Sequence, residues 1–248
     1  MQAQGMISAP IWAQLDFISA PYCTCCGLPF AFPIGEDIDT PAHDNSSGTV
    51  CMECLTHPPK FDALRSALIY NDASRRLLLG FKYGDKQHAA IPFARWMQLA
   101  GNDLILKSDY IVPIPLHWQR LWSRRFNQSF LLAKALHHLT KRPLLYNALQ
   151  RKRFTGPQKG LSRRDRQKNV RMAFHVNPKY TQQIKGKNIL LIDDVMTSGA
   201  TLNECARLLK YRGAANVYGL TVARVLKDTH LSPVFSKTDH TDPDEWDL

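Results

Sequence analysis

From residue 60 onward, the chain alternates between short apolar runs and longer stretches in which apolar residues recur at helical spacing. The short runs, such as the YIV of residues 110–112, favour strands, and the longer stretches favour amphipathic helices. This alternation predicts an α/β fold in which helices flank a mostly parallel sheet. The predicted elements are a strand at 67–70, helices at 73–84 and 92–101, a strand at 110–112, a helix from about Asn127, a strand at 188–192, a helix from Thr201 and a strand at 216–225.

The apolar run of residues 188–192 leads into two adjacent acids, Asp193 and Asp194, and then into small or hydroxylated residues. A helical pattern follows and ends near Gly213, which suits a C-cap. Residues 193–200 are therefore predicted to form a strand-to-helix turn at the carboxyl end of a buried strand. In open α/β sheets, ligands bind at that end of the strands.

The residue types in this turn suit a phosphate that lies beside a sugar. Gly199 lets the backbone approach a ligand closely, and the following helix offers unpaired N–H groups and a positive dipole end. The hydroxyls of Thr197, Ser198 and Thr201 can donate hydrogen bonds as well. The two acids would repel a phosphate, so we expect them to accept hydrogen bonds from ribose hydroxyls or to reach Mg²⁺.

Two other interpretations fit an apolar strand followed by acids. The acidic strand of a nucleotide hydrolase is disfavoured, because the chain contains neither GxxxxGK[ST] nor GxGxxG. An ordinary strand-to-helix turn with chance acids stays open on the residue pattern alone.

Composition limits the class of protein. The chain has 248 residues, of which 44% are hydrophobic and 21% charged, which suits one globular core plus a smaller module. No apolar run approaches the ~20 residues of a membrane span, and the first residues lack the pattern of a signal peptide. We therefore expect a soluble, cytoplasmic protein.

Charge is divided unevenly along the chain. Residues 1–59 contain six acids and neither Lys nor Arg, a balance of −6. Residues 60–248 contain all 32 basic residues and the other 15 acids, a balance of +17, and the two parts together give the net charge of +11. A basic body attracts nucleic acid or small anions such as pyrophosphates, and charge alone does not separate these two ligand classes.

Five of the six cysteines crowd into residues 23–54. Four of them form two pairs, Cys23-x-x-Cys26 and Cys51-x-x-Cys54. Two such pairs suit a tetrahedral Zn²⁺ bound by four thiolates, and in so small a module the metal is expected to be structural. Reduced or redox-active thiols are the alternative.

The remaining thiols and the loop between the pairs have separate interpretations. Cys25 is a spare thiol, because adjacent cysteines do not both bind one ion comfortably. Residues 31–48 are polar and rich in turn formers, which favours a surface loop, and they include His43 as a substitute metal ligand or, more commonly, a solvated histidine. Cys205 lies on the apolar side of a predicted helix and is expected in the core.

The stretch IDDVMTSGATL, residues 192–202, resembles the phosphoribosyl pyrophosphate (PRPP) motif of type I phosphoribosyltransferases. Three further stretches, FKYGDK, IVPIPLHWQRLWSRRFNQ and FTGPQKGLSRRDRQKNVRMAF, occur with the double CxxC. Together and in this order, the motifs resemble the ComF/GntX family, zinc-ribbon proteins with a type I phosphoribosyltransferase domain, over residues 23–224. That family is linked by name to DNA uptake and to the use of DNA as a nutrient.

The resemblance implies that Asp193 and Asp194 hold the ribose hydroxyls while the turn cradles the 5′-phosphate. It also implies a mobile basic hood over the substrate, with Mg²⁺ and guanidinium groups on the pyrophosphate. Two features depart from the family pattern: Arg125 replaces a usual glycine, and the zinc loop is longer than usual. The other implied site residues are Thr197, Ser198, Gly199, Ala200 and Thr201 in the turn, Pro113, Ile114, Pro115 and His117 near the pyrophosphate, and Gln158, Arg163, Arg164, Arg166 and Asn169 in the hood.

Three functions fit these features. They are a transferase that moves phosphoribose from PRPP to an unidentified acceptor, a nucleic-acid-binding accessory protein without turnover, and a regulator that senses PRPP. The candidate partners besides PRPP are single-stranded DNA and proteins of DNA uptake or nucleotide salvage. Trp118, Trp122 and Phe126 interleave with arginines in a pattern that could stack bases, although their helical spacing also suits core packing.

The same features predict three segments. Residues 1–59 form the zinc-ribbon module, which ends at a Pro-Pro linker, and residues 60–227 form the phosphoribosyltransferase-like domain. Residues 228–248 are expected to be a disordered tail, because they are polar and contain proline and late acids.

Overall fold

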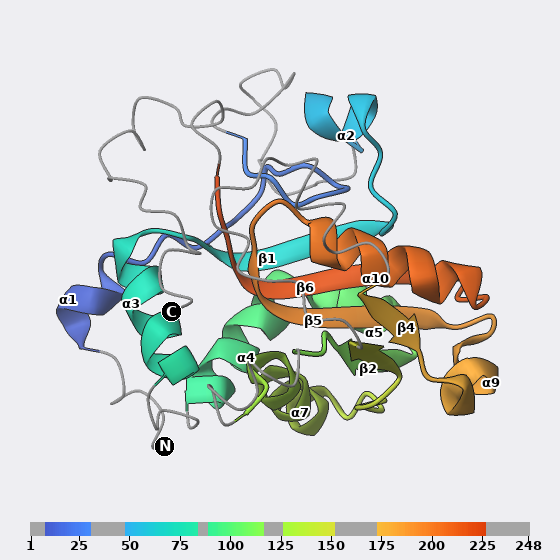
Figure 1. The fold of residues 1–248 in the computed structure, drawn as a ribbon. Helices are drawn as coiled ribbons and strands as arrows, with labels where there is room; N and C mark the ends of the chain where they lie inside the picture. Colours follow the sequence, from blue (N-terminus) through green and yellow to red (C-terminus); the bar gives the residue numbers. More distant parts are fainter. Residues whose placement is uncertain (1–7, 31–47, 84–88, 117–125, 152–172, 227–248) are drawn as a thin grey trace.

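The centre of the fold is a four-stranded sheet in which all neighbouring strands are parallel, in the order β1-β6-β5-β2 (Figure 1). This confirms the predicted α/β fold. The computed structural model describes residues 8–30, 48–83, 89–116, 126–151 and 173–226. The strands of the sheet are β1 (Ala63–Ile69), β2 (Tyr110–Pro113), β5 (Asn188–Met196) and β6 (Asn216–Arg224).

Strand β5 continues past the apolar run that predicts it. Its pairing with β6 includes Asp193 opposite Thr221 and Val195 opposite Ala223. The two aspartates are therefore among the last residues of β5, and only Thr197–Gly199 connect β5 to α10. Periodicity alone placed this boundary too early, because the acids interrupt the apolar run while the backbone ladder goes on.

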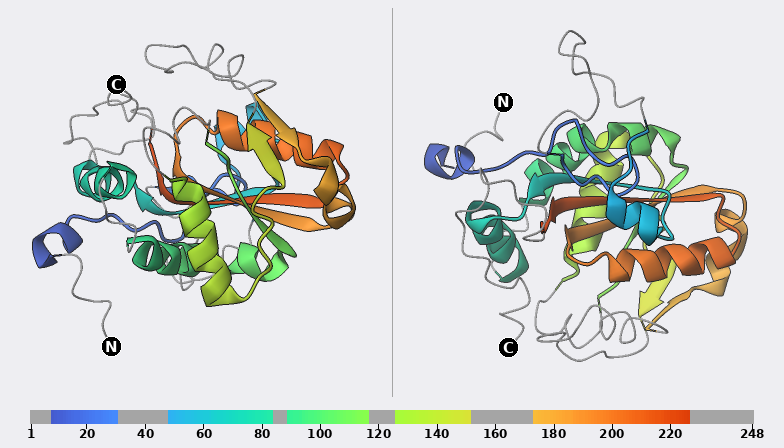
Figure 2. Two further views of the ribbon diagram at one scale, coloured as in Figure 1. Left: turned by 60° about the horizontal axis from the view of Figure 1, so that its bottom comes forward. Right: turned by 90° about the horizontal axis from the view of Figure 1, so that it is seen from above.

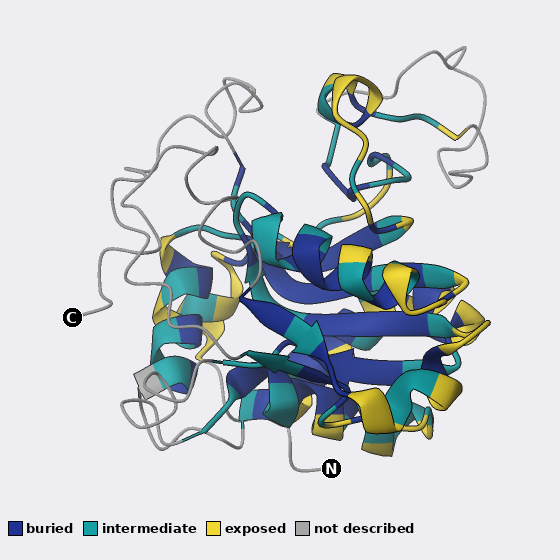
Figure 3. Ribbon diagram, turned by 45° about the vertical axis from the view of Figure 1, so that its right-hand side comes forward, coloured by how far each residue is buried: buried dark blue, intermediate teal, exposed yellow. Residues whose placement is uncertain are grey.

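Helices cover both faces of the sheet (Figures 1 and 2). One face packs against α4, α5 and α7, and the other against α10, which also contacts β4. Figure 3 shows that the strands between these layers are mostly buried. The main helices are α3 (Asp72–Tyr83), α4 (Ala90–Ala100), α5 (Asn102–Lys107), α7 (Gln128–Thr140) and α10 (Ala200–Tyr211), which confirms the helical periodicity in the sequence.

Smaller elements complete the described parts of the chain. An antiparallel pair of short strands, β3 and β4, lies outside the main sheet. None of the described helices is long and apolar enough to cross a lipid bilayer. The short elements are α1 (Ala9–Trp12), α2 (Met52–Thr56), β3 (Leu149–Arg151), β4 (Phe174–Val176), the 3-10 helix η4 (Pro178–Tyr180) and α9 (Thr181–Ile184).

The N-terminal segment adds to the free edge of β1. Phe17 forms an antiparallel bridge with Leu68, and the Ile18 N–H donates to the Ala67 carbonyl at 3.0 Å. This pairing covers an edge that would otherwise expose unpaired backbone groups. The division into a ribbon at 1–59 and a domain at 60–227 stays a prediction, and the tail at 228–248 lies outside the described residues.

Candidate functional site: an aspartate pair and a cysteine cluster

The turn after β5 needs a glycine at its last position. Gly199 has φ 72° and ψ 4°, in the left-handed region that side chains disfavour, and it is the N-cap of α10. A Cβ atom there would lie 3.2 Å from the Met196 Cε. The first N–H groups of α10 have no acceptor within the helix, so this end of the helix suits an anion. The five residues expected to cradle a phosphate, Thr197 to Thr201, are thus contiguous in this turn.

Asp193 lies at the carboxyl end of β5 and is held by a serine from a helix on one face of the sheet. The Ser129 hydroxyl of α7 donates to the Asp193 Oδ1 at 3.0 Å, and the Asp194 N–H donates to the same oxygen at 2.9 Å. Burial, together with the neighbouring charge of Asp194, raises the pKa of Asp193 to about 7, and the Ser129 hydrogen bond opposes the rise. The protonated and ionised forms of this carboxyl group are therefore both populated near neutral pH.

Asp194 has a cationic partner from another helix. The Lys82 ammonium of α3 lies 3.1 Å from the Asp194 Oδ2, and the two side chains are only 16% and 15% exposed. An ion pair so far removed from water is stronger than one on the surface, although desolvation offsets part of the gain. Lys82 also lowers the pKa of Asp193, so one cation serves both acids.

The start of α7 joins three parts of this site. Asn127 caps α7 by accepting from the Phe130 N–H at 3.3 Å, and its amide donates to the Ile114 carbonyl at 3.1 Å. The next residue, Gln128, donates to the Lys82 carbonyl at 3.2 Å. Together with Ser129, these residues connect α7 to the end of β2, to α3 and to the aspartates.

The sequence alone assigned no role to four side chains around the aspartates: Lys82, Asn127, Gln128 and Ser129. The stretches FKYGDK and FNQ, which contain three of them, contributed to the family resemblance without a stated function. A lysine or serine remote in sequence gives no local signal that it faces an acid. The family stretches were the signal that could have found Lys82, Asn127 and Gln128, whereas Ser129 lies just beyond them.

The end of β2 lies beside the end of β5 that carries the aspartates. The Ile114 N–H donates to the Ile192 carbonyl at 3.0 Å, directly before Asp193. Pro113 and Ile114 are buried, and Pro115 is partly buried. The other candidates, His117, Gln158, Arg163, Arg164, Arg166 and Asn169, lie outside the described residues, as do Trp118, Trp122 and Arg125.

The second constellation is a cluster of four buried cysteines. The sulfur atoms of Cys23, Cys26, Cys51 and Cys54 all lie within 4.8 Å of one another. The Sγ atoms of Cys26 and Cys51 are 3.7 Å apart. A tetrahedral zinc with bonds of ~2.3 Å holds its sulfurs about 3.8 Å apart, so this donor set fits such an ion. Cys25 is not part of the group, as expected.

Hydrogen bonds to the Cys23 sulfur stabilise a thiolate in this cluster. The Cys26 and Cys51 N–H groups donate to the Cys23 sulfur at 3.4 and 3.3 Å. The side-chain hydrogen bond from Cys26 lowers the pKa of Cys23 to about 4. The corresponding pKa of Cys26 is raised, chiefly by the same bond, because the thiols share their protons unequally. A divalent cation would replace those protons and be held by all four sulfurs.

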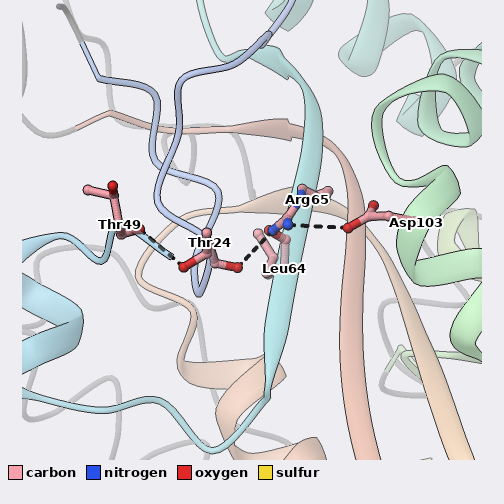
Figure 4. A network of polar contacts seen from close by, with 5 residues as sticks. All are labelled: Thr24, Thr49, Leu64, Arg65 and Asp103. Carbon is pink, nitrogen blue, oxygen red and sulfur yellow. Dashed lines mark hydrogen bonds and ion pairs between the residues drawn. The ribbon is translucent and has the colours of Figure 1, made fainter. Parts of the chain in front are cut away.

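Two arginines of the sheet anchor the segments that hold the four cysteines, residues 23–30 and 48–54, here called the cysteine module. Figure 4 shows the contacts of the first arginine. Arg65 of β1 donates to the Thr24 carbonyl at 3.0 Å and pairs with Asp103 at 3.3 Å, while the Thr24 hydroxyl donates to the Thr49 carbonyl at 3.1 Å. At the end of β6, the buried Arg224 donates to the Cys26 carbonyl at 2.6 Å. The module is thus attached to the strands that position the aspartate turn.

Comparisons with known proteins agree with this arrangement. Residues 143–237 match the family described as "Phosphoribosyl transferase domain". DNA utilization protein YhgH of Salmonella typhimurium is 32% identical over 209 residues, which cover 82% of this chain and 84% of that protein. The chain belongs to the ComF/YhgH family.

Two further relatives and one solved structure are also similar to this chain. Competence protein F of Haemophilus influenzae is 29% identical over 216 residues, covering 85% of this chain and 88% of the relative. Competence protein ComFC of Bacillus subtilis is 28% identical over 220 residues, covering 86% and 81%. Orotate phosphoribosyltransferase from Aeropyrum pernix aligns in structure with a TM-score of 0.34 and 17% identity, over 64% of this chain and 80% of that one.

Membership in the ComF/YhgH family confirms the resemblance in the sequence, including the phosphoribosyltransferase domain and the four-cysteine cluster. In the described residues, four thiols that could bind a metal such as zinc lie together, and two carboxylates lie at the end of β5, next to the turn that leads into α10.

Proposed function

We propose that this protein binds Mg²⁺–PRPP and transfers its phosphoribosyl group to an acceptor. The observation that carries the proposal is the pair Asp193–Asp194 at the end of β5, followed at once by the left-handed Gly199 and the start of α10. The phosphoribosyl transferase domain match over residues 143–237 supports it, because that match includes the whole turn.

Each part of the ligand has a counterpart in the turn and its surroundings. The N–H groups and hydroxyls of residues 197–201 would bind the 5′-phosphate, and the two carboxylates would accept from the ribose hydroxyls. Pro113–Pro115, next to Asp193, would border the pyrophosphate. Arg163, Arg164 and Arg166, the hood arginines that the family resemblance implies, would bind the same group, because guanidinium groups can bind phosphate bidentately.

This set of groups suits a displacement at the anomeric carbon. The C1–O bond to pyrophosphate breaks, and its electrons leave with the pyrophosphate while the acceptor forms a new bond to C1. Mg²⁺ bound with PRPP would supply charge neutralisation on the leaving group. The chain's own contribution is to orient the ribose, to hold the phosphate and to exclude water, so no nucleophilic side chain is needed.

We also infer that the cysteine cluster holds a structural Zn²⁺. Its four buried thiols leave no open coordination position for catalysis, and the sulfur spacing suits tetrahedral binding. Free thiols and a thiolate-bound metal are typical of a reducing compartment, which favours a cytoplasmic location.

A role in handling DNA is the second candidate. It is favoured by the names of the relatives, "DNA utilization protein" and "Competence protein", and by the balance of +17 over residues 60–248. Binding through phosphates would weaken steeply with salt, because counterions are released on association. A charge reversal at Arg163 and Arg164 should then weaken binding to all sequences alike, whereas a salt-insensitive affinity would remove nucleic acid from the list of partners.

A PRPP-sensing regulator is the third candidate and differs from the transferase only in the absence of pyrophosphate release.

The decisive test is calorimetric titration of the protein with Mg²⁺–PRPP. Asp193→Asn combined with Asp194→Asn should lower the affinity on the order of a hundredfold, because two charge-assisted hydrogen bonds of ~1.5–3 kcal/mol each are weakened. Ribose 5-phosphate should compete with PRPP. Asp72→Asn, an exposed acid at the start of α3, is the matched control and should leave binding unchanged. Equal affinity of the parent and the double variant would show that the aspartates do not hold the ribose.

A further inference from the structure

A cavity of about 60 Å³ lies between the cysteine module and the turn after β5. Cys26 and Cys54 line it from the module, and Thr197 and Ser198 line it from the turn. Among the described residues, neither aspartate of the site belongs to its lining. The module therefore faces the part of the site that we expect to hold the 5′-phosphate. Neither the zinc assignment nor the PRPP assignment requires this arrangement.

We propose that metal binding at the cysteine cluster and phosphate binding at the turn are coupled through Arg224 and Asn203, so that the metal-loaded protein binds PRPP more tightly than the metal-free protein. The inference rests on the proposed PRPP and zinc sites, and it gives the cluster a regulatory function in addition to a structural one. Such coupling needs contacts that reach the turn and that differ between the two metal states. The structure contains two routes of this kind, one at each end of the turn.

The first route passes through Arg224, at the end of β6. This side chain is only 6% exposed, and its Nη1 donates to the Cys26 carbonyl at 2.6 Å and lies 3.9 Å from the Cys26 sulfur. Arg224 is paired with Met196 of β5, and the N–H of the next residue, Val225, donates to the Met196 carbonyl at 2.9 Å. One buried side chain thus connects a cysteine of the cluster to the residue directly before the turn.

The second route reaches the other end of the turn. The N–H of Lys60, which follows the module in the chain, donates to the Asn203 Oδ1 at 2.7 Å. Asn203 lies in the first turn of α10, and its own N–H donates to the Gly199 carbonyl at 2.9 Å. A shift of the chain after Cys54 would therefore act on the glycine that ends the turn.

Side-chain packing joins the same two regions. The four cysteines belong to one buried apolar cluster with Met196 and with Leu202 of α10. The end of the Met196 side chain lies close to the turn, since a Cβ atom on Gly199 would be 3.2 Å from the Met196 Cε. Densely packed side chains transmit small displacements because they have little free space in which to absorb them.

The metal would hold the module end of both routes in place. The module consists of two short segments, and a unit of this size depends on its metal for a fixed structure. Without the ion, Cys26 and Cys54 have no common bond, and the Cys26 carbonyl and the chain that leads to Lys60 are free to shift. The turn would then adopt the phosphate-binding geometry for a smaller fraction of the time, which lowers the apparent affinity for PRPP.

Coupling between two sites is reciprocal, so it is measured in two independent ways. The affinity of the full-length protein for Mg²⁺–PRPP is measured by calorimetry, with the metal in place and after its removal by a chelator under reducing conditions. The zinc affinity is measured by competition with a chromophoric chelator, with and without PRPP. We expect a factor of roughly ten or more in both, within the ~5–150-fold that is usual for such couplings. Capture of zinc by the phosphates of the ligand would change the zinc affinity in the opposite direction.

The choice of ligand separates this coupling from a general loss of folded structure. Ribose 5-phosphate carries the phosphate that the turn would bind, whereas Mg²⁺–pyrophosphate would bind beside Pro113–Pro115. We expect ribose 5-phosphate to raise the zinc affinity about tenfold and pyrophosphate to change it by less than about twofold. If both ligands raise it equally, the metal acts by keeping the whole chain folded, and the proposal is wrong.

Two buried arginines provide a matched pair of variants. Arg224→Met removes the bond to the Cys26 carbonyl, and Arg65→Met removes a comparable bond to the Thr24 carbonyl that leads to β1 and not to the turn. Arg224→Met should lower the coupling factor to below about threefold, while Arg65→Met should keep it within about twofold of the parent. Equal losses in the two variants would overturn the route through Arg224.

Asn203→Ala is the second variant in case Arg224→Met does not fold. Asn203 is only partly buried, so its substitution should spare the fold while it removes the acceptor of the Lys60 N–H. We expect the coupling factor of this variant to be at least about threefold below that of the parent. A direct contact of Asn203 with the phosphate would instead lower the PRPP affinity equally in both metal states, and an unchanged coupling factor would overturn the second route.

The outcomes separate this proposal from those on which it rests. If PRPP binds equally to the metal-loaded and metal-free protein, the coupling is wrong while the PRPP site stands. If PRPP does not bind the metal-loaded protein, the PRPP site and the coupling both fall. If the cluster takes up no zinc, the zinc site and the coupling fall, and the PRPP site is judged by its own titration.

Discussion

The cysteine cluster and the aspartate turn differ in where their components come from. All four thiols lie within residues 23–54, in two pairs whose spacing alone defines the donor set. The aspartates are adjacent in sequence, but their partners Lys82 and Ser129 come from α3 and α7, far along the chain. The cysteine cluster is formed by residues close in sequence, whereas the aspartates gain their partners only when the sheet and the helices α3, α7 and α10 have packed together.

The two regions also balance their negative charge differently. The thiols surround a position suited to a permanent cation, and their sulfurs leave little space for a further ligand. The negative charge of the aspartates is balanced by the Lys82 side chain, whose flexible stem allows it to move when a ligand binds. This contrast is typical of a structural centre beside a binding centre, and each of the following experiments tests one side of it.

The largest effect should come from breaking the cluster. Cys51→Ser removes one of four thiolates, so we expect zinc to fall from near one per chain to a small fraction of that. The lost metal binding should lower the free energy of unfolding by at least ~3 kcal/mol, which corresponds to a melting temperature lower by about 6–12 °C. Metal analysis and thermal unfolding measure both quantities.

Cys25→Ser is the control for the cluster, because Cys25 is outside the four-sulfur group. It should leave the zinc content unchanged. Loss of metal in this variant would assign a different ligand set, and stoichiometric disulfides without metal in protein purified under reducing conditions would contradict the zinc site altogether.

The next largest effect should come from the glycine of the turn. Gly199→Val places a branched side chain at φ 72° and in the space where a phosphate would meet the backbone. We expect a loss of PRPP affinity on the order of a hundredfold, together with a modest loss of stability of ~1–3 kcal/mol from backbone strain. Titration and thermal unfolding separate these two contributions.

Gly186 offers a matched control. It has almost the same backbone angle, φ 71°, but a Cβ there would meet nothing within 4 Å. Gly186→Val should therefore lose a similar amount of stability and keep PRPP binding. If both variants lose PRPP equally, the effect of Gly199 is strain alone and not contact with a ligand.

A smaller effect is expected at Lys82. Lys82→Met removes one partner of a largely buried ion pair, and the two aspartates are left without their shared cation. We expect a destabilisation below the ~3–5 kcal/mol that breaking a fully buried pair costs, because both side chains keep some exposure to water. Adding Asp194→Asn to Lys82→Met should recover part of the loss, which a double-mutant cycle would measure. Additive losses would show that the 3.1 Å contact contributes no coupling energy.

The difference between the two regions also explains what the sequence could predict. The strand, the turn and the cluster were predicted because each has a signal within about 30 residues: an apolar run, a glycine after hydroxylated residues, and paired cysteines. Lys82, Ser129 and Arg224 had no such signal, since their roles depend on the packing of α3, α7 and β6 around β5. The cavity between the two regions could not be predicted for the same reason, because its walls are remote in sequence.

The last prediction concerns protons at Asp193. Its pKa is raised to about 7 in the folded protein, whereas an unfolded aspartate ionises near ~3.9. Between these values, the folded chain keeps a proton that the unfolded chain has released. The stability of the ligand-free protein should therefore fall as the pH rises from about 4 to 7 and change little above that range. Thermal unfolding of the parent and of Asp193→Asn would measure this, since the variant lacks the titrating group.

Ligand binding should show the opposite trend. Ribose hydroxyls donate to the ionised carboxylate, so PRPP affinity should rise about tenfold between pH 6 and 8 if the pKa of Asp193 is about 7. Asp193→Asn keeps the titration of PRPP itself and should lack this additional rise. Ser129→Ala removes the hydroxyl that lowers the pKa of Asp193, so its affinity curve should have a midpoint at higher pH than the parent's. A midpoint that does not move would mean that the 3.0 Å hydrogen bond from α7 positions the carboxylate without tuning its charge, and that the turn is less dependent on distant helices than the contrast with the cysteine cluster implies.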